Sequence, residues 1–194
     1  MRILSGKLKG SKILTSKNRI KGSEDFITRP TSDRVKETLF NIVQHGFNID
    51  FANVSFLDCF SGSGAIGLEA ISRGCLSVSF LEKNNAACSC IQKNLDNFNL
   101  NDNDIGLGYR ILNYDFFDKD LLLDNEFDVV FLDPPYDMER VSEVFLRLKE
   151  LRVTKENSLI IYESNKELVK VDKLEILKSR KTGKTHLSFL KFLN

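Results

Sequence analysis

The sequence predicts an α/β fold with a doubly wound, mostly parallel sheet that contains one antiparallel strand. From residue 54 onward, short apolar runs alternate with segments whose apolar residues recur at helical spacing. The last two runs are separated only by a tight turn at Thr182-Gly183, which predicts an antiparallel hairpin. With 194 residues, of which 42% are hydrophobic and 28% charged, the chain suits one domain with a full core. Repeated βα units that end in a hairpin therefore define the fold class.

The beginning of the chain predicts a basic arm in front of this domain. We expect a small β-hairpin over residues 2–15, followed by a loop to residue 30. Residues 1–36 hold ten lysines and arginines against three acids, a net charge of +7, whereas the remainder carries −6. This asymmetry indicates a surface for nucleic acid, although the whole chain is almost neutral at +1. We therefore divide the chain into an arm over residues 1–30 and a doubly wound domain over residues 31–194.

The domain is expected to begin with a helix to about residue 44, which Thr31 or Ser32 can cap. The strands expected after it are 54–59, 77–82, 107–112, 127–132, 158–163, 174–180 and 185–192. The helices expected between them are 65–73, 84–98, 116–123 and 140–151. Gly74 closes the first of these helices, and Asn84 caps the second.

Residues 127–136, Phe-Asp-Val-Val-Phe-Leu-Asp-Pro-Pro-Tyr, are the most informative about function. Ligands in open α/β sheets bind beyond the carboxyl ends of the strands, where Asp133 lies. The prolines stiffen this turn and bring no N–H, so the turn offers carbonyl oxygens and a carboxylate. A planar group with an amine suits it, because the amine can donate to Asp133 and the Pro134 carbonyl while the ring stacks on Tyr136. The alternative is a proline-rich turn that only closes a strand.

A glycine-rich loop, Gly62-Ser63-Gly64, stands between a predicted strand and a predicted helix. A nucleotide-type cofactor requires such a loop, but the same spacing also suits dinucleotide-binding proteins. Asp58 at the end of the strand distinguishes the two classes. Its carboxylate would repel a pyrophosphate, whereas it would attract a cofactor with a cationic amino group and a sulfonium.

Acidic residues also follow the next two predicted strands. Glu82 is placed to accept hydrogen bonds from both hydroxyls of a ribose. Asp115 could accept from an adenine amine, with Phe116 or Phe117 against the ring. Together with Asp58, these residues favour S-adenosylmethionine over NAD.

This motif series resembles that of class I amino-methyltransferases. Three stretches restrict the resemblance to one family within this class. They are Arg2-Ile3-Leu4-Ser5-Gly6, residues 29–41 (RPTSDRVKETLFN) and residues 57–64 (LDCFSGSG). They resemble the RsmD family of bacterial methyltransferases, which act on a guanine N2 of small-subunit ribosomal RNA. The resemblance runs from residue 2 to about residue 192 and is weaker over 99–126 and 164–182.

The resemblance implies a class I, Rossmann-like sheet of seven strands and S-adenosylmethionine as the cofactor. It implies 16S ribosomal RNA, in the 30S subunit or an assembly intermediate, as the substrate. It also implies that Arg29, Thr31 and Arg34 lie near the cofactor or the RNA, and we assign the first two to the cofactor. Because no base-reading pattern is evident on the arm, its contacts to RNA phosphates are expected from Lys7, Lys9 and Lys12 together with Arg34.

Three other functions stay open at this point. A DNA amino-methyltransferase is the nearest alternative, but about fifty residues outside the Rossmann-like core leave little room for a target-recognition domain. A nicotinamide oxidoreductase would leave Asp58 and the Asp-Pro-Pro-Tyr turn unexplained. A non-catalytic RNA-binding protein could keep the same fold.

Other features of the sequence argue against a membrane protein, a secreted protein and a metal-binding protein. No apolar stretch is long enough to span a bilayer, and the first residues do not resemble a signal peptide. The four cysteines form no CxxC pair and have no histidine nearby, so we expect reduced thiols and no metal ion. We expect a cytoplasmic monomer that does not bind a membrane.

Overall fold

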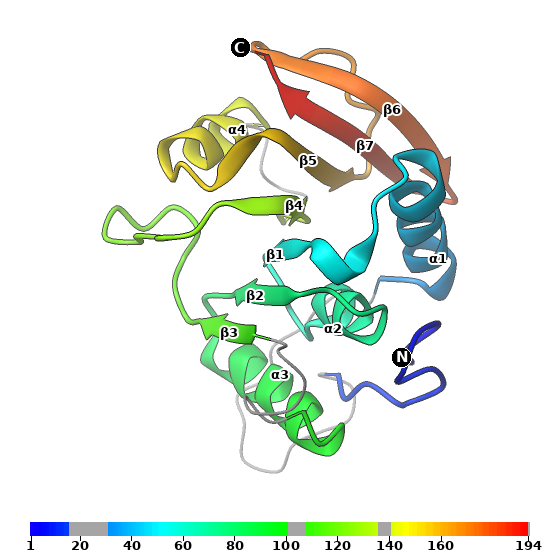
Figure 1. The fold of residues 1–194 in the computed structure, drawn as a ribbon. Coiled ribbons are helices and arrows are strands. Elements are labelled where there is room, and N and C mark those ends of the chain that lie inside the picture. The colour runs from blue at the N-terminus through cyan, green and yellow to red at the C-terminus, as the bar shows by residue number, and fades with distance from the viewer. Residues whose placement is uncertain (16–30, 101–107, 136–140, 194) are drawn as a thin grey trace.

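The fold is a single seven-stranded sheet with helices on both faces (Figure 1). The computed structural model describes residues 1–15, 31–100, 108–135 and 141–193. The strands are β1 (Ser55–Cys59), β2 (Ser77–Leu81), β3 (Gly108–Leu112), β4 (Phe127–Leu132), β5 (Thr154–Ser164), β6 (Leu174–Thr182) and β7 (Thr185–Phe192). Their order is β3-β2-β1-β4-β5-β7-β6, and β7 alone runs against its neighbours. The predicted doubly wound sheet with one antiparallel strand is therefore confirmed.

Helices cover the two faces unequally. The described helices are α1 (Asp33–Asn41), which continues as a π-helical turn (Ile42–Gly46), a 3-10 turn (Phe51–Asn53), α2 (Ala65–Ser72), α3 (Asn85–Asn97) and α4 (Val141–Glu150). Apolar residues of α1, α2 and α3 pack on one face of the sheet, and those of α4 pack on the other. Both predicted caps are confirmed: the Ser32 hydroxyl accepts from the Val35 N–H at 3.2 Å, and Asn84 accepts from the Ala87 N–H at 3.0 Å.

The N-terminal arm is anchored to the domain and folds back as a minimal hairpin, in which the N–H groups of Ile3 and Ile13 donate to the carbonyls of Ser11 and Met1. Arg2 and Lys12 make one antiparallel bridge, and glycine-containing turns occupy the residues between them. Ile3 and Ile13 are each 1% exposed and belong to the core that α1 and α2 share with the sheet. This burial holds the described part of the arm, residues 1–15, against the sheet domain. The expected boundary at residue 30 lies outside the described residues.

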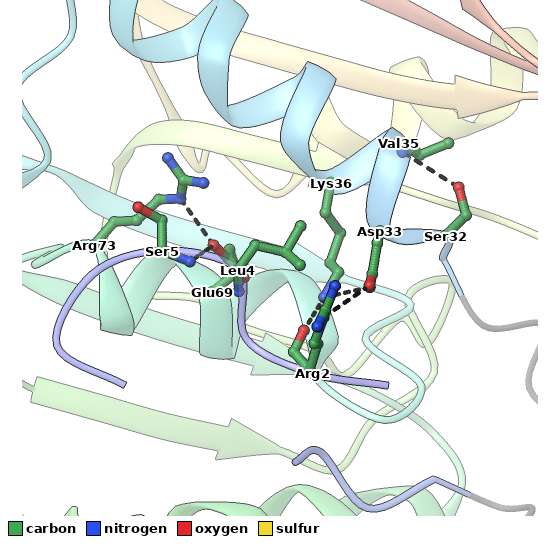
Figure 2. A network of polar contacts seen from close by, with 9 residues as sticks. All are labelled: Arg2, Leu4, Ser5, Ser32, Asp33, Val35, Lys36, Glu69 and Arg73. Carbon is green, nitrogen blue, oxygen red and sulfur yellow. Dashed lines mark hydrogen bonds and ion pairs between the residues drawn. The ribbon is translucent and has the colours of Figure 1, made fainter. Parts of the chain in front are cut away.

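Polar contacts fix the arm to α2 (Figure 2). Glu69 of α2 is fully buried, and its carboxylate accepts from the N–H groups of Leu4 and Ser5 at 2.8 and 3.0 Å. Arg73, the C-cap residue of α2, donates to the same carboxylate at 3.0 Å. Removing one partner from such a buried charged pair is strongly destabilising. The arm is therefore held at the one position where its N–H groups reach the Glu69 carboxylate.

A buried lysine fixes the arm to α1 (Figure 2). Lys36 is 0% exposed; its ammonium group donates to the Arg2 carbonyl and lies 3.6 Å from the Asp33 carboxylate. The Arg2 side chain also reaches Asp33, at 3.2 Å. Burial lowers the pKa of Lys36, although the nearby Glu69 and Asp33 carboxylates act in the opposite direction. Lys36 is therefore a structural link and is not available as a surface charge for RNA.

One expected helix is absent. Residues 116–120 form two successive turns and residues 121–123 have no regular structure, because acidic side chains there bond to the backbone and compete with helical bonding. The Asp115 carboxylate accepts from the Phe117 N–H at 3.0 Å, and Asp118 does the same for the Asp120 N–H at 3.0 Å. This segment therefore runs as an irregular connection beside the site described next.

Candidate active site

A pocket of about 380 Å³ opens at the carboxyl edge of the sheet, the edge at which the parallel strands end. It lies over β1 and β4, where the strand order reverses and where doubly wound proteins bind their ligands. The sequence-predicted residues that line it are Thr31, Asp58, Gly62, Glu82, Asp115, Phe116, Asp133 and Pro134. Residues from five separate segments therefore converge as expected, within the size range of small-molecule sites.

Three of the acidic residues that line the pocket occupy equivalent positions at the ends of three strands. Each carries a Phe-Leu-acid triplet, ending at Asp58 on β1, at Glu82 after β2 and at Asp133 after β4. Successive residues of a strand point to opposite faces, and the three phenylalanines lie in the core under α1, α2 and α3. The acids, two residues further on, point to the same side. Because Asp58 pairs with Phe131, Asp133 stands two residues further toward solvent.

Asp58 is the most deeply buried of these acids, at 1% exposure. Its carboxylate accepts from the Gly67 N–H of α2 at 2.9 Å, and its carbonyl accepts from the Ser61 hydroxyl at 2.6 Å. Burial raises the pKa of Asp58 to about 8, and the charges of Asp133 and Glu82 add to the effect, whereas the Gly67 bond opposes it. A cationic guest would stabilise the ionised form, so the buried acid suits a positively charged ligand.

Glu82 holds the glycine loop. Its two oxygens accept from the N–H groups of Gly62 and Asn84 at 2.8 and 2.9 Å, so one carboxylate ties the loop to the start of α3. The loop needs left-handed backbone at Phe60, Gly62 and Gly64, with φ of 59°, 55° and 74°. Gly64 caps α2 and packs on the core; it does not line the pocket.

The Asp115 end of the pocket is aromatic. Phe116 is 2% exposed and packs against Phe60, with ring centroids 5.0 Å apart, and both rings line the pocket. Asp115 beside them bonds Lys83 at 3.1 Å. Partial burial would raise the pKa of Asp115, but its bonds from Phe117 and Lys83 outweigh this and hold the pKa below its ordinary value. This end therefore offers a ring surface next to an ionised acceptor.

Several predicted residues lie elsewhere or are not described. Arg29 and Tyr136 fall outside the described residues. Lys7, Lys9 and Lys12 are exposed on the arm, and Arg34 is exposed on the first turn of α1; none of the four lines the pocket.

The structure also adds pocket residues that sequence reasoning missed: Phe60, Lys83 and Tyr114. The signal for Phe60 was its place between Asp58 and the glycines. The repeated Phe-Leu-acid triplet, which marks equivalent strand ends, was available in the sequence as well. A metal-binding group of three or more acidic, histidine or cysteine residues does not occur in the described parts of the chain. No helix there has the length and apolar character needed to cross a bilayer.

Comparisons with known proteins identify the family of this chain. The family described as Conserved hypothetical protein 95 matches residues 1–191. Ribosomal RNA small subunit methyltransferase D of Haemophilus influenzae is 33% identical over 187 residues, covering 94% of this chain and 89% of that protein. A protein of the same name from Buchnera aphidicola is 30% identical over 200 residues, covering 100% and 93%.

Solved structures share the architecture of this chain. A Haemophilus influenzae structure described as a methylase has a TM-score of 0.74 at 29% identity, covering 100% of this chain and 98% of that one. A methyltransferase structure complexed with S-adenosylhomocysteine shares the fold at a TM-score of 0.53 and 15% identity, covering 77% of this chain and 49% of that one. From the family match and the relatives together, the chain belongs to the RsmD family, the ribosomal RNA small subunit methyltransferases D.

Proposed function

We propose that the protein transfers a methyl group from S-adenosylmethionine to the exocyclic N2 of a guanine in 16S ribosomal RNA. One observation carries this proposal: the acceptor turn at Asp133 and Pro134 lines the same pocket as Asp58, Gly62 and Glu82. A binding site for a cationic cofactor and a binding site for an amine therefore share one cavity. The names of the relatives, which specify methylation of small-subunit ribosomal RNA, support the choice of substrate.

The pocket residues fit S-adenosylmethionine by their chemistry. Asp58 faces the cationic part, Glu82 the ribose hydroxyls, and Asp115 with Phe116 the adenine. Glu82 already accepts from two backbone N–H groups, and each carboxylate oxygen has a further lone pair for a hydroxyl. The bound cofactor supplies an electrophilic methyl group on a sulfonium. A pyrophosphate cofactor would place negative charge against the same three acids, which disfavours NAD.

The acceptor turn acts on the amine. The lone pair of a guanine amine is delocalised into its ring, so the nitrogen is a weak nucleophile. Hydrogen bonds from the amine to Asp133 and the Pro134 carbonyl favour a pyramidal nitrogen and stabilise its developing positive charge. The nitrogen gains one carbon–nitrogen bond as the sulfur–methyl bond breaks and leaves a neutral thioether, and it loses one proton, which Asp133 or water accepts. Tyr136 is the proposed stacking surface for the flipped guanine.

The exposed lysines of the arm are proposed to hold the RNA by its phosphates. Lys7, Lys9 and Lys12 are all exposed, and their segment is anchored through Glu69. Arg34 on α1 is a further exposed cation. Contacts of this kind supply affinity and register, and they carry little sequence information.

Radiolabelled methyl transfer to 30S particles from cells that lack this protein tests the proposal. The expected product after digestion is N2-methylguanosine, and the Asp133→Ala protein should form it at a rate lower by about 10²-fold or more while it still binds the cofactor. Unmethylated DNA tests the nearest alternative in the same assay. Label that appears only in DNA, or on another nucleoside, would contradict the proposed substrate. Calorimetry with S-adenosylmethionine and with NAD tests the oxidoreductase alternative. Binding of NAD in place of S-adenosylmethionine would favour that alternative.

A further inference from the structure

A second basic surface lies at the end of the β6–β7 hairpin. It consists of Lys178, Arg180, Lys181 and Lys184, which we call the hairpin cluster. All four side chains are exposed, and residues 178–184 include no acid. Within the described parts of the chain, none of the four makes an ion pair, whereas Lys191 at the other end of the hairpin bonds Glu175 at 3.0 Å.

Strand register places this cluster at the edge of the sheet that holds the pocket. Ser164, the last residue of β5, pairs with His186 of β7, which pairs in turn with Lys181 of β6. On the other side of β5, Tyr162 pairs with Leu132, the residue before Asp133. The turn of the hairpin and the acceptor turn therefore emerge at the same edge.

The separation suits one nucleic-acid strand. β6 is three strand positions from β4, and neighbouring strands lie about 4.8 Å apart, so the span along the sheet is on the order of 15 Å. A strand that rises about 3.4 Å per nucleotide covers this span in about four nucleotides. RNA whose target base enters the pocket can therefore bring a nearby phosphate to the hairpin.

The cluster is also adjacent to the elements that carry the other basic residues. Lys178 lies beside the end of the α1 segment, because a Cβ added to Gly46 would be 3.6 Å from its ammonium nitrogen. At its other end, α1 contacts the arm through Lys36 and Asp33. Figure 1 shows the α1 segment next to β6, with the N-terminal arm on the same side of the sheet.

We propose that the hairpin cluster is a second contact site for phosphates of the RNA that flanks the target base. This inference rests on the proposed function, since it assumes an RNA substrate at the Asp133 turn. The arm and the hairpin would then contact phosphates of the same RNA at two separate places. The competing explanation is that lysines on the edge strand β6 only prevent pairing with other sheets. Edge protection does not account for Lys184, because this residue lies in the turn and not on the strand edge.

A matched pair of triple variants tests the inference. In the first, Arg180, Lys181 and Lys184 are each changed to Gln. In the second, the control, Lys149, Arg152 and Lys173 are changed to Gln. The control residues are also exposed and their replacement removes the same charge, but they lie before β5 and β6, at the opposite edge of the sheet.

Binding to 30S particles is measured against salt concentration for both variants and the unmodified protein. The slope of log affinity against log salt falls by about 0.7–0.9 for each phosphate that is no longer neutralised, so the hairpin variant should show a slope smaller by about 2–3. Its affinity at low salt should fall about tenfold or more, and its affinity for S-adenosylmethionine should be unchanged. The control should keep the original slope.

An unchanged slope in the hairpin variant would overturn the inference, and so would an equal decrease in both variants. Aggregation of the hairpin variant with a normal slope would support the edge-protection explanation instead. The proposed function fails separately, if the unmodified protein binds the particles but transfers no methyl group to their guanines.

Discussion

Replacing Asp58 with asparagine should stabilise the cofactor-free protein at pH 8 and weaken its binding of S-adenosylmethionine. Burial, with the charges of Asp133 and Glu82, raises the pKa of the Asp58 carboxyl from 3.8 to about 8. Between these two pH values the folded protein keeps a proton at this position that the unfolded chain has lost. The folded state therefore binds more protons, and its free energy of unfolding falls as the pH rises through this window.

The magnitude follows from the two pKa values. One pH unit corresponds to about 1.4 kcal/mol, so the interval from 3.8 to about 8 gives an upper limit of roughly 5–6 kcal/mol. Water that enters the open pocket when the acid ionises reduces this figure, and we expect about 2 kcal/mol or more. Asparagine keeps the size of the side chain and an oxygen for the Gly67 N–H, so the substitution removes mainly the charge. The gain should be small at pH 5 and largest at pH 8.

Binding of the cofactor should favour the ionised form of Asp58, whereas the cofactor-free protein favours the protonated form. A cation beside Asp58 favours the carboxylate, so binding near pH 7 should release about one proton from this side chain. Calorimetry in two buffers of different ionisation enthalpy measures that proton, and the Asp58→Asn protein should release about one fewer. Affinity of the unmodified protein should increase up to tenfold per pH unit between about pH 6 and 8. Equal proton release by both proteins, or equal stability at pH 8, would refute the role of this acid.

Three further substitutions probe other parts of the molecule. Asp133→Ala should lower methyl transfer by about 10²-fold or more and leave the Kd for the cofactor unchanged, because the acid stabilises charge only during reaction; near-normal turnover would reject this role. Glu82→Ala should weaken cofactor binding by roughly 1.5–3 kcal/mol, measured by calorimetry, and unchanged binding would remove the ribose assignment. Gly6→Ala should destabilise the protein in urea denaturation far more than Gly10→Ala. Both glycines have left-handed φ, 81° and 88°, but only at Gly6 would the new Cβ lie 1.7 Å from the Ser72 carbonyl oxygen. Equal destabilisation would show that the arm does not depend on close contact with α2.

The parts of the fold that the sequence predicts well are those determined by neighbouring residues. Ser32 and Asn84 cap their helices because a short polar side chain can reach the N–H groups two or three residues ahead. The strand before Asp133 is predicted because a short apolar run before two prolines has few other structures available. The strands that end near Asp58, Glu82 and Asp133 are parallel, so the residues that follow their ends meet at one edge of the sheet. The cofactor half of the pocket is therefore largely predictable.

The position of the arm is not predictable in this way. Its anchors join residues far apart in the chain, such as Leu4 with Glu69, and local patterns carry no information about such pairs. Lys36 shows the consequence. In the sequence it adds to the positive charge of the first 36 residues, yet in the structure it is fully buried and bonded to the Arg2 carbonyl. The positive charge that residues 1–36 expose is therefore smaller than their composition indicates, and Lys7, Lys9 and Lys12 are among the exposed cations.

The same buried contacts connect the arm to the pocket. Asp33 accepts from Arg2 and lies beside Lys36, so the first turn of α1 is held where the arm docks. Ser32 caps that turn, and Thr31, the residue before it, lines the pocket. A shift of the arm would move Asp33 and with it the chain that carries Thr31. The segment proposed to bind RNA and the pocket proposed to bind the cofactor are thus positioned by the same turn of helix. An arm that docks correctly is therefore a condition for a correctly shaped pocket, in addition to its proposed role in holding the RNA.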